Sequence, residues 1–269
     1  LRLPATLIGK LIAINVLVFL ACWLFPPGSP HLSVYEQVHL EPEEIITHPW
    51  KAYQVITYGF VHAPVRMIKE GKSKGTGDGI FHILFNMFAL FVFGRSLETQ
   101  YGQKELLVFY LTAIVLGGLL WSGYGLYDDQ ILPLVGASGG VYAIAILFCL
   151  NYPKQVLLLF GVIPMPAWVV GIMIVAMDQL MGIFADDNVA HSVHLAGAGF
   201  ALIYYQTGIK LAQQLASVKI EAKPAKPAPG CTARTQRTPA APRPAGQAAR
   251  RSAADRPDAA GPAPMPLHR

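Results

Sequence analysis

The chain has little charge and few cysteines. Only 14% of its 269 residues are Asp, Glu, Lys or Arg, whereas 53% are hydrophobic. Soluble domains carry about 25% charged residues, so this composition indicates a membrane protein. The three cysteines fall in two apolar runs and a proline-rich segment, and they indicate neither a disulfide framework nor a thiolate metal site; they are Cys22, Cys149 and Cys231.

The net charge of +5 is concentrated at the C-terminal end. Residues 210–269 contain eleven Lys and Arg against three acidic residues, and ten of the 21 prolines follow Ala216. Such a segment cannot bury enough apolar surface to offset its chain entropy. We therefore predict a membrane domain over residues 1–212 and a basic, disordered cytoplasmic tail over residues 213–269. The tail could bind anionic lipid or nucleic acid, but a solvated tail is favoured and no nucleic-acid partner is expected.

The apolar residues gather in six runs, which predict an all-α polytopic membrane protein with six transmembrane helices and a long first outer loop. Runs shorter than about 20 residues are tolerated where a helix lines a water-filled cavity instead of lipid. In the fifth run, Pro164 and Pro166 predict a helix start, with Val156–Ile163 leading into it. The runs are Leu11–Phe25, Ile80–Gly94, Leu106–Trp121, Gly136–Leu150, Val156–Met177 and Val193–Tyr205.

Lys and Arg are distributed asymmetrically around the short loops. The loops Ser122–Val135 and Ala185–Ser192 contain no Lys or Arg, whereas the alternate loops and the tail are basic. Positive residues mark the cytoplasmic side, so both termini are expected there, in a bacterial inner membrane. Arg2 and Lys10 before the first run would also fit a signal peptide, but no small-x-small cleavage site follows, and we favour a retained span.

Three polar residues fall at one predicted depth. His82, Ser138 and His194 each lie in the first turn of a span that enters from the outer face. Ionisable residues inside spans are functional by default, because burying them in lipid is costly. Asn86 follows His82 by four residues and Tyr142 follows Ser138 by four, so each pair shares a helix face. The outer end of the bundle is therefore the predicted site.

Small residues would let the fourth and sixth spans approach closely enough for a hydrogen bond between Ser138 and His194. We expect this packing role for Gly139, Gly140 and Gly197. Each feature also has a simpler interpretation. A lone serine in a membrane helix usually bonds its own i−4 carbonyl, and a lone histidine or asparagine usually joins two helices.

Other sites are less well supported by the pattern. His191 and His194 are three residues apart, but no His-Glu-x-x-His is present and no carboxylate shares their helix turn, so no metal site is expected. Asp178 could orient a histidine, although we expect it near the outer interface and in water. Because no carboxylate is evident as a third member beside Ser138 and His194, the sequence predicts a Ser-His dyad.

The segment Gly136–Gly140 fits the G-x-S-x-G nucleophile elbow, but no strand precedes it, so a soluble hydrolase fold is not expected.

Four motifs together resemble the rhomboid family of intramembrane serine proteases over about Trp50 to Gly199. "HPWKAYQVITYGFVH" resembles the family's first loop with its Trp-Arg pair, and "HILFNM" resembles its His-x-x-x-Asn. "GASGG" is similar to its nucleophile motif, and "AHSVHLAG" is similar to its last histidine motif. Two features depart from the family pattern: Lys51 replaces the usual Arg, and an insertion at Ala63–Gly79 separates His62 from the second motif.

The resemblance implies an intramembrane serine endopeptidase without a cofactor, acting on membrane-anchored proteins within the bilayer. It implies Ser138 as nucleophile and His194 as general base, with His82, Asn86 and the Ser138 backbone N–H stabilising the oxyanion. Tyr142 would pack against the catalytic histidine. An inactive relative that binds transmembrane clients is the main rival, followed by a transporter or haem protein with histidine ligands. The oligomeric state cannot be read from the sequence.

Overall fold

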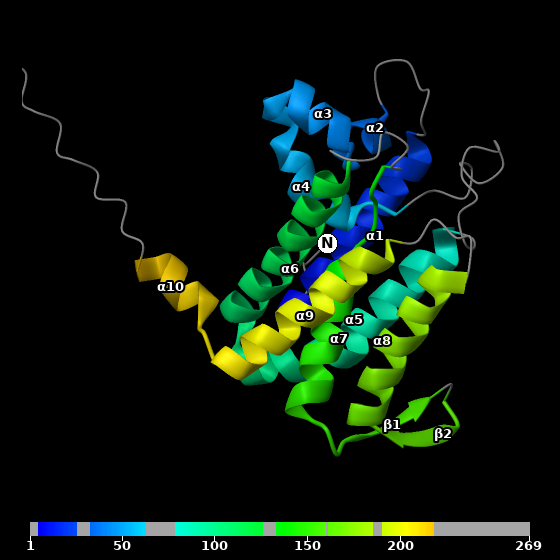
Figure 1. The fold of residues 1–269 in the computed structure, drawn as a ribbon, viewed down its shortest axis with the longest axis vertical. Helices are drawn as coiled ribbons and strands as arrows, with labels where there is room; N and C mark the ends of the chain where they lie inside the picture. Colours follow the sequence, from blue (N-terminus) through cyan, green and yellow to red (C-terminus); the bar gives the residue numbers. More distant parts are fainter. Residues whose placement is uncertain are drawn as a thin grey trace, which may run out of the picture. The chain divides into compact units, whose positions relative to one another are not determined.

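The computed structural model describes residues 5–25, 33–62, 79–125, 133–159, 161–184 and 190–217, which all lie in one compact unit, Leu1–Ile220. The predicted disordered tail beyond Ser217 and the insertion at residues 63–78 lie outside the described residues. The unit is mostly helical (Figure 1). Its longer helices are α1 (Leu7–Leu24), α5 (Gly79–Tyr101), α6 (Gln103–Tyr124), α7 (Ser138–Asn151), α8 (Ala167–Phe184) and α9 (His191–Thr207).

Short helices complete the first loop and the C-terminal end of the described chain. The first loop holds α2 (Val34–Val38), α3 (Pro42–Thr47), α4 (Gln54–Thr57) and the 3₁₀ helices η1 (Pro49–Tyr53) and η2 (Tyr58–Phe60). After α9, α10 (Leu211–Ser217) begins where the Glu105 carboxylate accepts the backbone N–H groups of Leu211 and Ala212, at 2.7 and 2.9 Å. Helical structure therefore continues beyond residue 212, where we predicted the tail to begin.

Four described helices, α1, α5, α6 and α8, are long and apolar enough to cross a membrane. The chain is accordingly a multi-pass membrane protein of helical type. Each of the six predicted apolar runs overlaps one of the longer helices. The helices α7 and α9 have only 14 and 17 residues, so the count of six crossings stays a prediction.

The fifth apolar run contains a hairpin followed by a helix. Its first half forms an antiparallel hairpin of β1 (Val156–Leu159) and β2 (Ile163–Pro166), in which Val156 pairs with Pro166. The helix α8 begins directly after, at Ala167, so Pro164 and Pro166 do precede a helix start. A short apolar run fits a strand as well as a helix, and periodicity does not separate the two.

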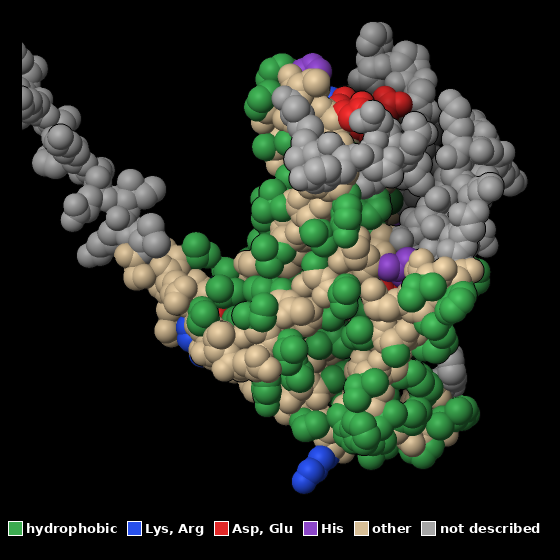
Figure 2. All heavy atoms as spheres, viewed as in Figure 1, with side chains coloured by type: hydrophobic (Ala, Val, Ile, Leu, Met, Phe, Trp, Pro, Cys, Tyr) green, Lys and Arg blue, Asp and Glu red, His purple; other side chains and the backbone are tan. Residues whose placement is uncertain are grey.

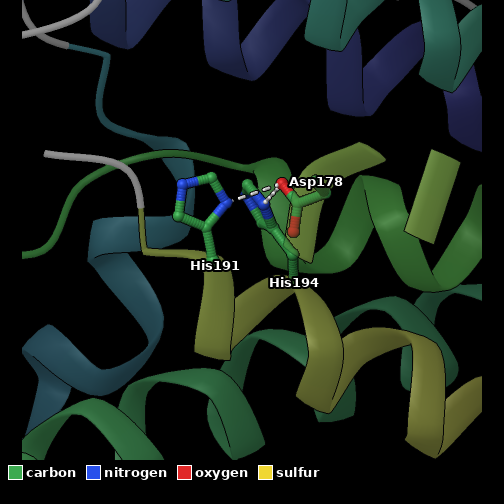
Figure 3. A group of neighbouring side chains, drawn as sticks. All are labelled: Asp178, His191 and His194. Carbon is green, nitrogen blue, oxygen red and sulfur yellow. Dashed lines mark hydrogen bonds and ion pairs between the residues drawn. The ribbon is translucent and has the colours of Figure 1, made fainter. Parts of the chain in front are cut away.

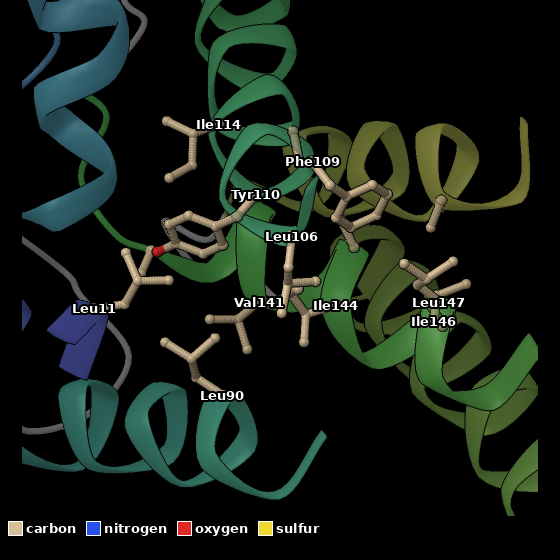
Figure 4. Close-up of a cluster of buried hydrophobic side chains, with 14 of the residues drawn as sticks. Leu11, Leu90, Leu106, Phe109, Tyr110, Ile114, Val141, Ile144, Ile146 and Leu147 are labelled. Atoms are coloured by element: carbon tan, nitrogen blue, oxygen red, sulfur yellow. The ribbon is translucent and has the colours of Figure 1, made fainter. Parts of the chain in front are cut away.

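The helix α7 lies at the centre of the bundle, where it packs against α5, α6, α8 and α9. Figure 4 shows Val141, Ile144 and Leu147 among side chains of neighbouring helices, including Leu90 and Phe109. At about 1.5 Å per residue, 14 residues span only about 21 Å, less than the ~30 Å of hydrocarbon. Because other helices surround it, α7 does not need to extend through the full thickness of the hydrocarbon.

Hydrophobic side chains are spread over the whole helical body on the face drawn in Figure 2, with few charged side chains among them. On α1 and α5 the exposed residues include Leu17 and Phe85, at 60% and 68% exposure. Large exposed apolar surfaces are unfavourable in water, and here they face outward along helices of membrane-spanning length. This surface is suited to contact with lipid.

The first loop is anchored to the segment that leads into α7. Tyr58 is buried against α6, where its hydroxyl donates to the Ile114 carbonyl at 2.7 Å. The Tyr58 carbonyl in turn accepts the Gly136 N–H at 3.1 Å. Leu40 and Leu134 exchange two backbone hydrogen bonds, at 3.0 and 2.9 Å. These contacts fix the backbone immediately before Ser138.

Candidate active site

Ser138 and His194 meet at the ends of two adjacent helices. Ser138 is the first residue of α7, and His194 lies in the first turn of α9. Their side chains are joined by a hydrogen bond of 2.8 Å between Ser138 Oγ and His194 Nε2. The sequence-based expectation that these two residues share one depth agrees with this geometry. His194 is buried, whereas Ser138 is partly exposed.

Asp178 completes a chain of three polar groups. Its Oδ1 lies 2.8 Å from His194 Nδ1, and its side chain is only 8% exposed. A carboxylate can only accept, so the Nδ1 hydrogen points to Asp178 and the Nε2 lone pair faces the Ser138 hydroxyl. We expected Asp178 in water and no carboxylate beside Ser138 and His194, and both expectations were wrong.

The position of Asp178 could have been suspected from the sequence. Asp178 is the only charged residue of α8, and an ionisable group within a span is a candidate for function. The predicted run ended at Met177, one residue before Asp178. In the structure the helix starts later and continues to Phe184, so Asp178 lies inside it. The predicted end of the run therefore left the carboxylate one residue outside the span.

Tyr142 packs against the imidazole of His194. The two rings are stacked, with centroids 4.3 Å apart and planes within 4° of parallel. The Tyr142 hydroxyl donates to the Ile174 carbonyl of α8 at 3.4 Å. This stacking restricts the rotation of the imidazole between Ser138 and Asp178, in the place that the resemblance implied.

His82 and Asn86 lie on one face of α5 beside the same site. The Asn86 amide donates to the His82 carbonyl at 2.9 Å, which leaves its second hydrogen available. A Cβ placed on Gly136 would lie 3.2 Å from His82 Cε1 and 3.6 Å from Ser138 Oγ. Gly136, with φ of +120°, therefore keeps a small space open between the two side chains. Within the described part of the chain, neither His82 nor Asn86 has a hydrogen bond to Ser138.

Of the three predicted packing glycines, two lie between α7 and α9. A Cβ on Gly197 would collide with the Gly139 carbonyl oxygen, and a Cβ on Gly139 would lie 2.8 Å from Val193 Cγ1. The third, Gly140, faces α6, where a Cβ would meet Tyr110 at 2.7 Å. Gly140 therefore allows close packing of α6 and not of α9, because successive positions of a helix point in directions about 100° apart.

His62 and the Trp50-Lys51 pair belong to the first loop. His62 is fully buried with its ring centroid 5.2 Å from that of His82, and burial together with the neighbouring His82 lowers the pKa of His62 to about 3. Lys51 forms an ion pair with Glu44, and the hydrogen bond from Lys51 lowers the pKa of the Glu44 carboxyl. Trp50 is exposed and stands edge-on to His48. Among the described residues, the hydrogen bond of the Ser138 side chain is to His194 and not to any of these side chains.

The arrangement has the parts needed for acyl transfer. Ser138 is a hydroxyl beside a base, the base is oriented by Asp178 and Tyr142, and the first N–H groups of α7 have no partner within the helix. A helix N-terminus stabilises negative charge, so an oxyanion that forms beside Ser138 would face favourable donors. The site matches the geometry of a serine hydrolase placed at the end of a membrane helix.

Comparison with known proteins agrees with this interpretation. The family model described as "Rhomboid domain" matches residues 78–210. The chain is 33% identical to RHOMBOID-like protein 12, mitochondrial, of Arabidopsis thaliana, over 46% of this chain and 41% of the relative. It is 26% identical to Rhomboid protein 1, mitochondrial, of Saccharomyces cerevisiae, over 75% and 53%. The human Presenilin-associated rhomboid-like protein, mitochondrial, is 28% identical over 49% and 35%. The chain spans about half or less of the length of these relatives.

Proposed function

The chain belongs to the rhomboid family, and we propose that it is an intramembrane serine endopeptidase with Ser138 as its nucleophile. The observation that carries the proposal is the hydrogen bond of 2.8 Å between Ser138 Oγ and His194 Nε2. A lone structural serine would be expected to bond its own i−4 carbonyl, as Ser122 does with Gly118 at 2.8 Å. Ser138, as the first residue of α7, bonds a base on another helix.

Catalysis begins when Ser138 attacks a peptide carbonyl and His194 Nε2 accepts the hydroxyl proton. His194 then returns the proton to the leaving amine, and water repeats the sequence to release the acyl group. Asp178 is a positioning residue that holds the imidazole in the required tautomer and stabilises the imidazolium. The proposed mechanism therefore has three members, where the sequence predicted a dyad.

The tetrahedral oxyanion would be held by the backbone N–H of Ser138 together with His82 and Asn86. Gly136 leaves open the space between His82 and Ser138, where a Cβ would lie 3.2 Å from His82 Cε1 and 3.6 Å from Ser138 Oγ. In other hydrolases the loss of one such donor raises the barrier by about 2.7–4 kcal/mol. Tyr142 supports the geometry without contacting the reacting atoms.

Membrane-anchored proteins are the proposed substrates, as membership of the family implies. The site lies at the end of short helices, so a substrate segment would reach it from the outer part of the bilayer. An intact helix engages its carbonyls in hydrogen bonds, so the segment must unwind locally before attack. The mitochondrial names of the relatives do not support the bacterial inner membrane that we expected, and the cytoplasmic placement of the termini stays a prediction.

A reconstituted cleavage assay with a model transmembrane substrate tests the proposal. Ser138→Ala should reduce cleavage at least about 10³-fold, because knockouts of the nucleophile in serine proteases have effects of this size or larger. Ser122→Ala is the matched control, since it removes a helical serine of ordinary type, and its rate should match the wild type.

Covalent labelling gives a second readout that does not require a known substrate. A fluorophosphonate probe should label Ser138 in the wild type, and the label should disappear in His194→Ala. Undiminished cleavage by Ser138→Ala would overturn the proposal. A folded wild-type chain that neither cleaves nor labels would favour the inactive client-binding alternative.

A further inference from the structure

Three metal-ligating side chains converge beside the serine. Asp178 Oδ1 lies 2.8 Å from His194 Nδ1 and 3.0 Å from His191 Nδ1. One potential ligand atom from each residue lies within 4.8 Å of the other two. Figure 3 shows both imidazoles directed at the same carboxylate, from α9 toward α8. The sequence-based argument against a metal site was that no carboxylate shares the histidine turn, and α8 supplies that carboxylate.

The donor set suits a zinc ion. Zn²⁺ prefers imidazole nitrogen and carboxylate oxygen in tetrahedral geometry, and two histidines with one carboxylate form a known set with one open position. Zinc–ligand bonds of about 2.0–2.1 Å place neighbouring donors about 3.3 Å apart. The two Asp178 contacts, at 2.8 and 3.0 Å, would have to widen by a few tenths of an ångström. The ligand atoms of His191 and His194, within 4.8 Å of each other, would have to reach the same separation of about 3.3 Å.

A neighbouring residue, Gln179, holds Asp178 and His191 in place by hydrogen bonds. The Gln179 amide donates to Asp178 Oδ2 at 2.9 Å and to the His191 carbonyl at 3.1 Å. Hydrogen bonds of this kind orient ligands before a metal arrives. Gln179 holds one carboxylate oxygen and thereby leaves Oδ1 facing both histidines. The side chains are 8–14% exposed, so the site is sheltered but not sealed.

We propose that Asp178, His191 and His194 bind Zn²⁺ and that the bound ion switches the protease off. A metal on His194 Nδ1 displaces the proton from that nitrogen, and the neutral ring then carries its proton on Nε2. Nε2–H can only donate to Ser138 Oγ and cannot take its proton. The same imidazole therefore serves as base when it is bonded to Asp178 and is inactive when it is bonded to the metal.

The inhibitory half of this inference rests on the proposed function, whereas metal binding does not. Binding is measured on the full chain in detergent with Ser138→Ala, using Co²⁺ as the probe. Tetrahedral Co²⁺ should give visible absorption bands that Zn²⁺ removes by competition. His191→Asn in the same background should weaken Co²⁺ binding at least about tenfold, as loss of a supporting or direct ligand does elsewhere. His48→Asn, at an exposed histidine of the first loop, should leave binding unchanged.

Inhibition is measured on the active chain, with each variant normalised to its own metal-free rate. Micromolar Zn²⁺ should slow the wild type at least about tenfold, and a chelator should restore the rate; His191→Asn should need at least about ten times more Zn²⁺. Millimolar Mg²⁺ should have no effect, because it prefers oxygen ligands. Equal Zn²⁺ sensitivity of the wild type and His191→Asn, or Co²⁺ binding unaffected by His191→Asn, would overturn the inference. Co²⁺ binding at the cluster without inhibition of an active wild type would overturn its inhibitory half.

Discussion

Two residues, Asp178 and Gly136, define the geometry around the Ser138–His194 pair. Asp178 is fixed on one side by the Gln179 amide and on the other by two imidazoles, so its carboxylate has a defined orientation. Gly136 has a positive φ, and a Cβ on it would lie close to both His82 and Ser138. Both positions are specific enough for substitutions with defined expected results.

Asp178→Asn should lower kcat while leaving KM within a few-fold. The amide can no longer guarantee an acceptor opposite Nδ1, so part of the population holds the wrong tautomer of His194. The expected fall lies between about tenfold and 10⁴-fold, the upper value being that of the corresponding change in a soluble Ser-His-Asp protease. Steady-state kinetics and the rate of fluorophosphonate labelling at Ser138 measure the effect, and thermal unfolding checks the fold. An unchanged kcat would show that Ser138 and His194 act as a dyad.

Gly136→Ala should abolish most of the activity and also reduce stability. A methyl group would occupy the space between His82 and Ser138, and a residue with a Cβ is strained at φ of +120° by about 1–3 kcal/mol. We expect at least a tenfold loss of kcat, measured together with the midpoint of thermal unfolding. Gly123→Ala on α6 is the matched control, because a Cβ there meets nothing within 4 Å. Equal activity of the two variants would show that the space is not used in the reaction.

At the scale of whole elements, the sequence predicted the positions of the longer helices well, but it predicted less well which helices pack together. Runs of apolar residues predict the longer helices because both the lipid and the protein core require apolar side chains. The hairpin of Val156–Pro166 was missed because an apolar run of this length fits either structure. Periodicity places residues on faces but does not say which helix lies opposite. Gly140 was therefore assigned to the wrong neighbour, and Asp178 was expected in water instead of beside a histidine.

The contact between α7 and α9 depends on one glycine more than on the others. A Cβ on Gly197 would meet the Gly139 carbonyl, whereas a Cβ on Gly199 meets nothing within 4 Å. Gly197→Ala should therefore separate the helices and break the Ser138–His194 hydrogen bond, with a loss of both unfolding midpoint and cleavage. Gly199→Ala should keep activity and gain up to about 1 kcal/mol from helix propensity. Full activity in Gly197→Ala would show that the helices can adjust without moving the site.

At the scale of the whole molecule, the two ends of the bundle differ in their chemistry. The site lies at the end where α7 and α9 begin, together with the first loop. The hairpin and α10 follow the opposite ends of these helices, near Lys154 and Lys210. Positive residues mark the side on which a loop is retained during insertion, so the site end should face away from the cytoplasm or its equivalent.

Single-cysteine labelling tests this orientation. After the native cysteines are replaced, Trp50→Cys and Lys154→Cys place one exposed thiol at each end of the described bundle. In bacterial spheroplasts expressing the chain, a membrane-impermeant maleimide should label Trp50→Cys directly and Lys154→Cys only after permeabilisation. The reversed pattern would contradict the assignment from positive charge and would require substrates to enter from the other leaflet. Labelling of both thiols in intact spheroplasts would show that the hairpin end is not separated from the site end by the bilayer.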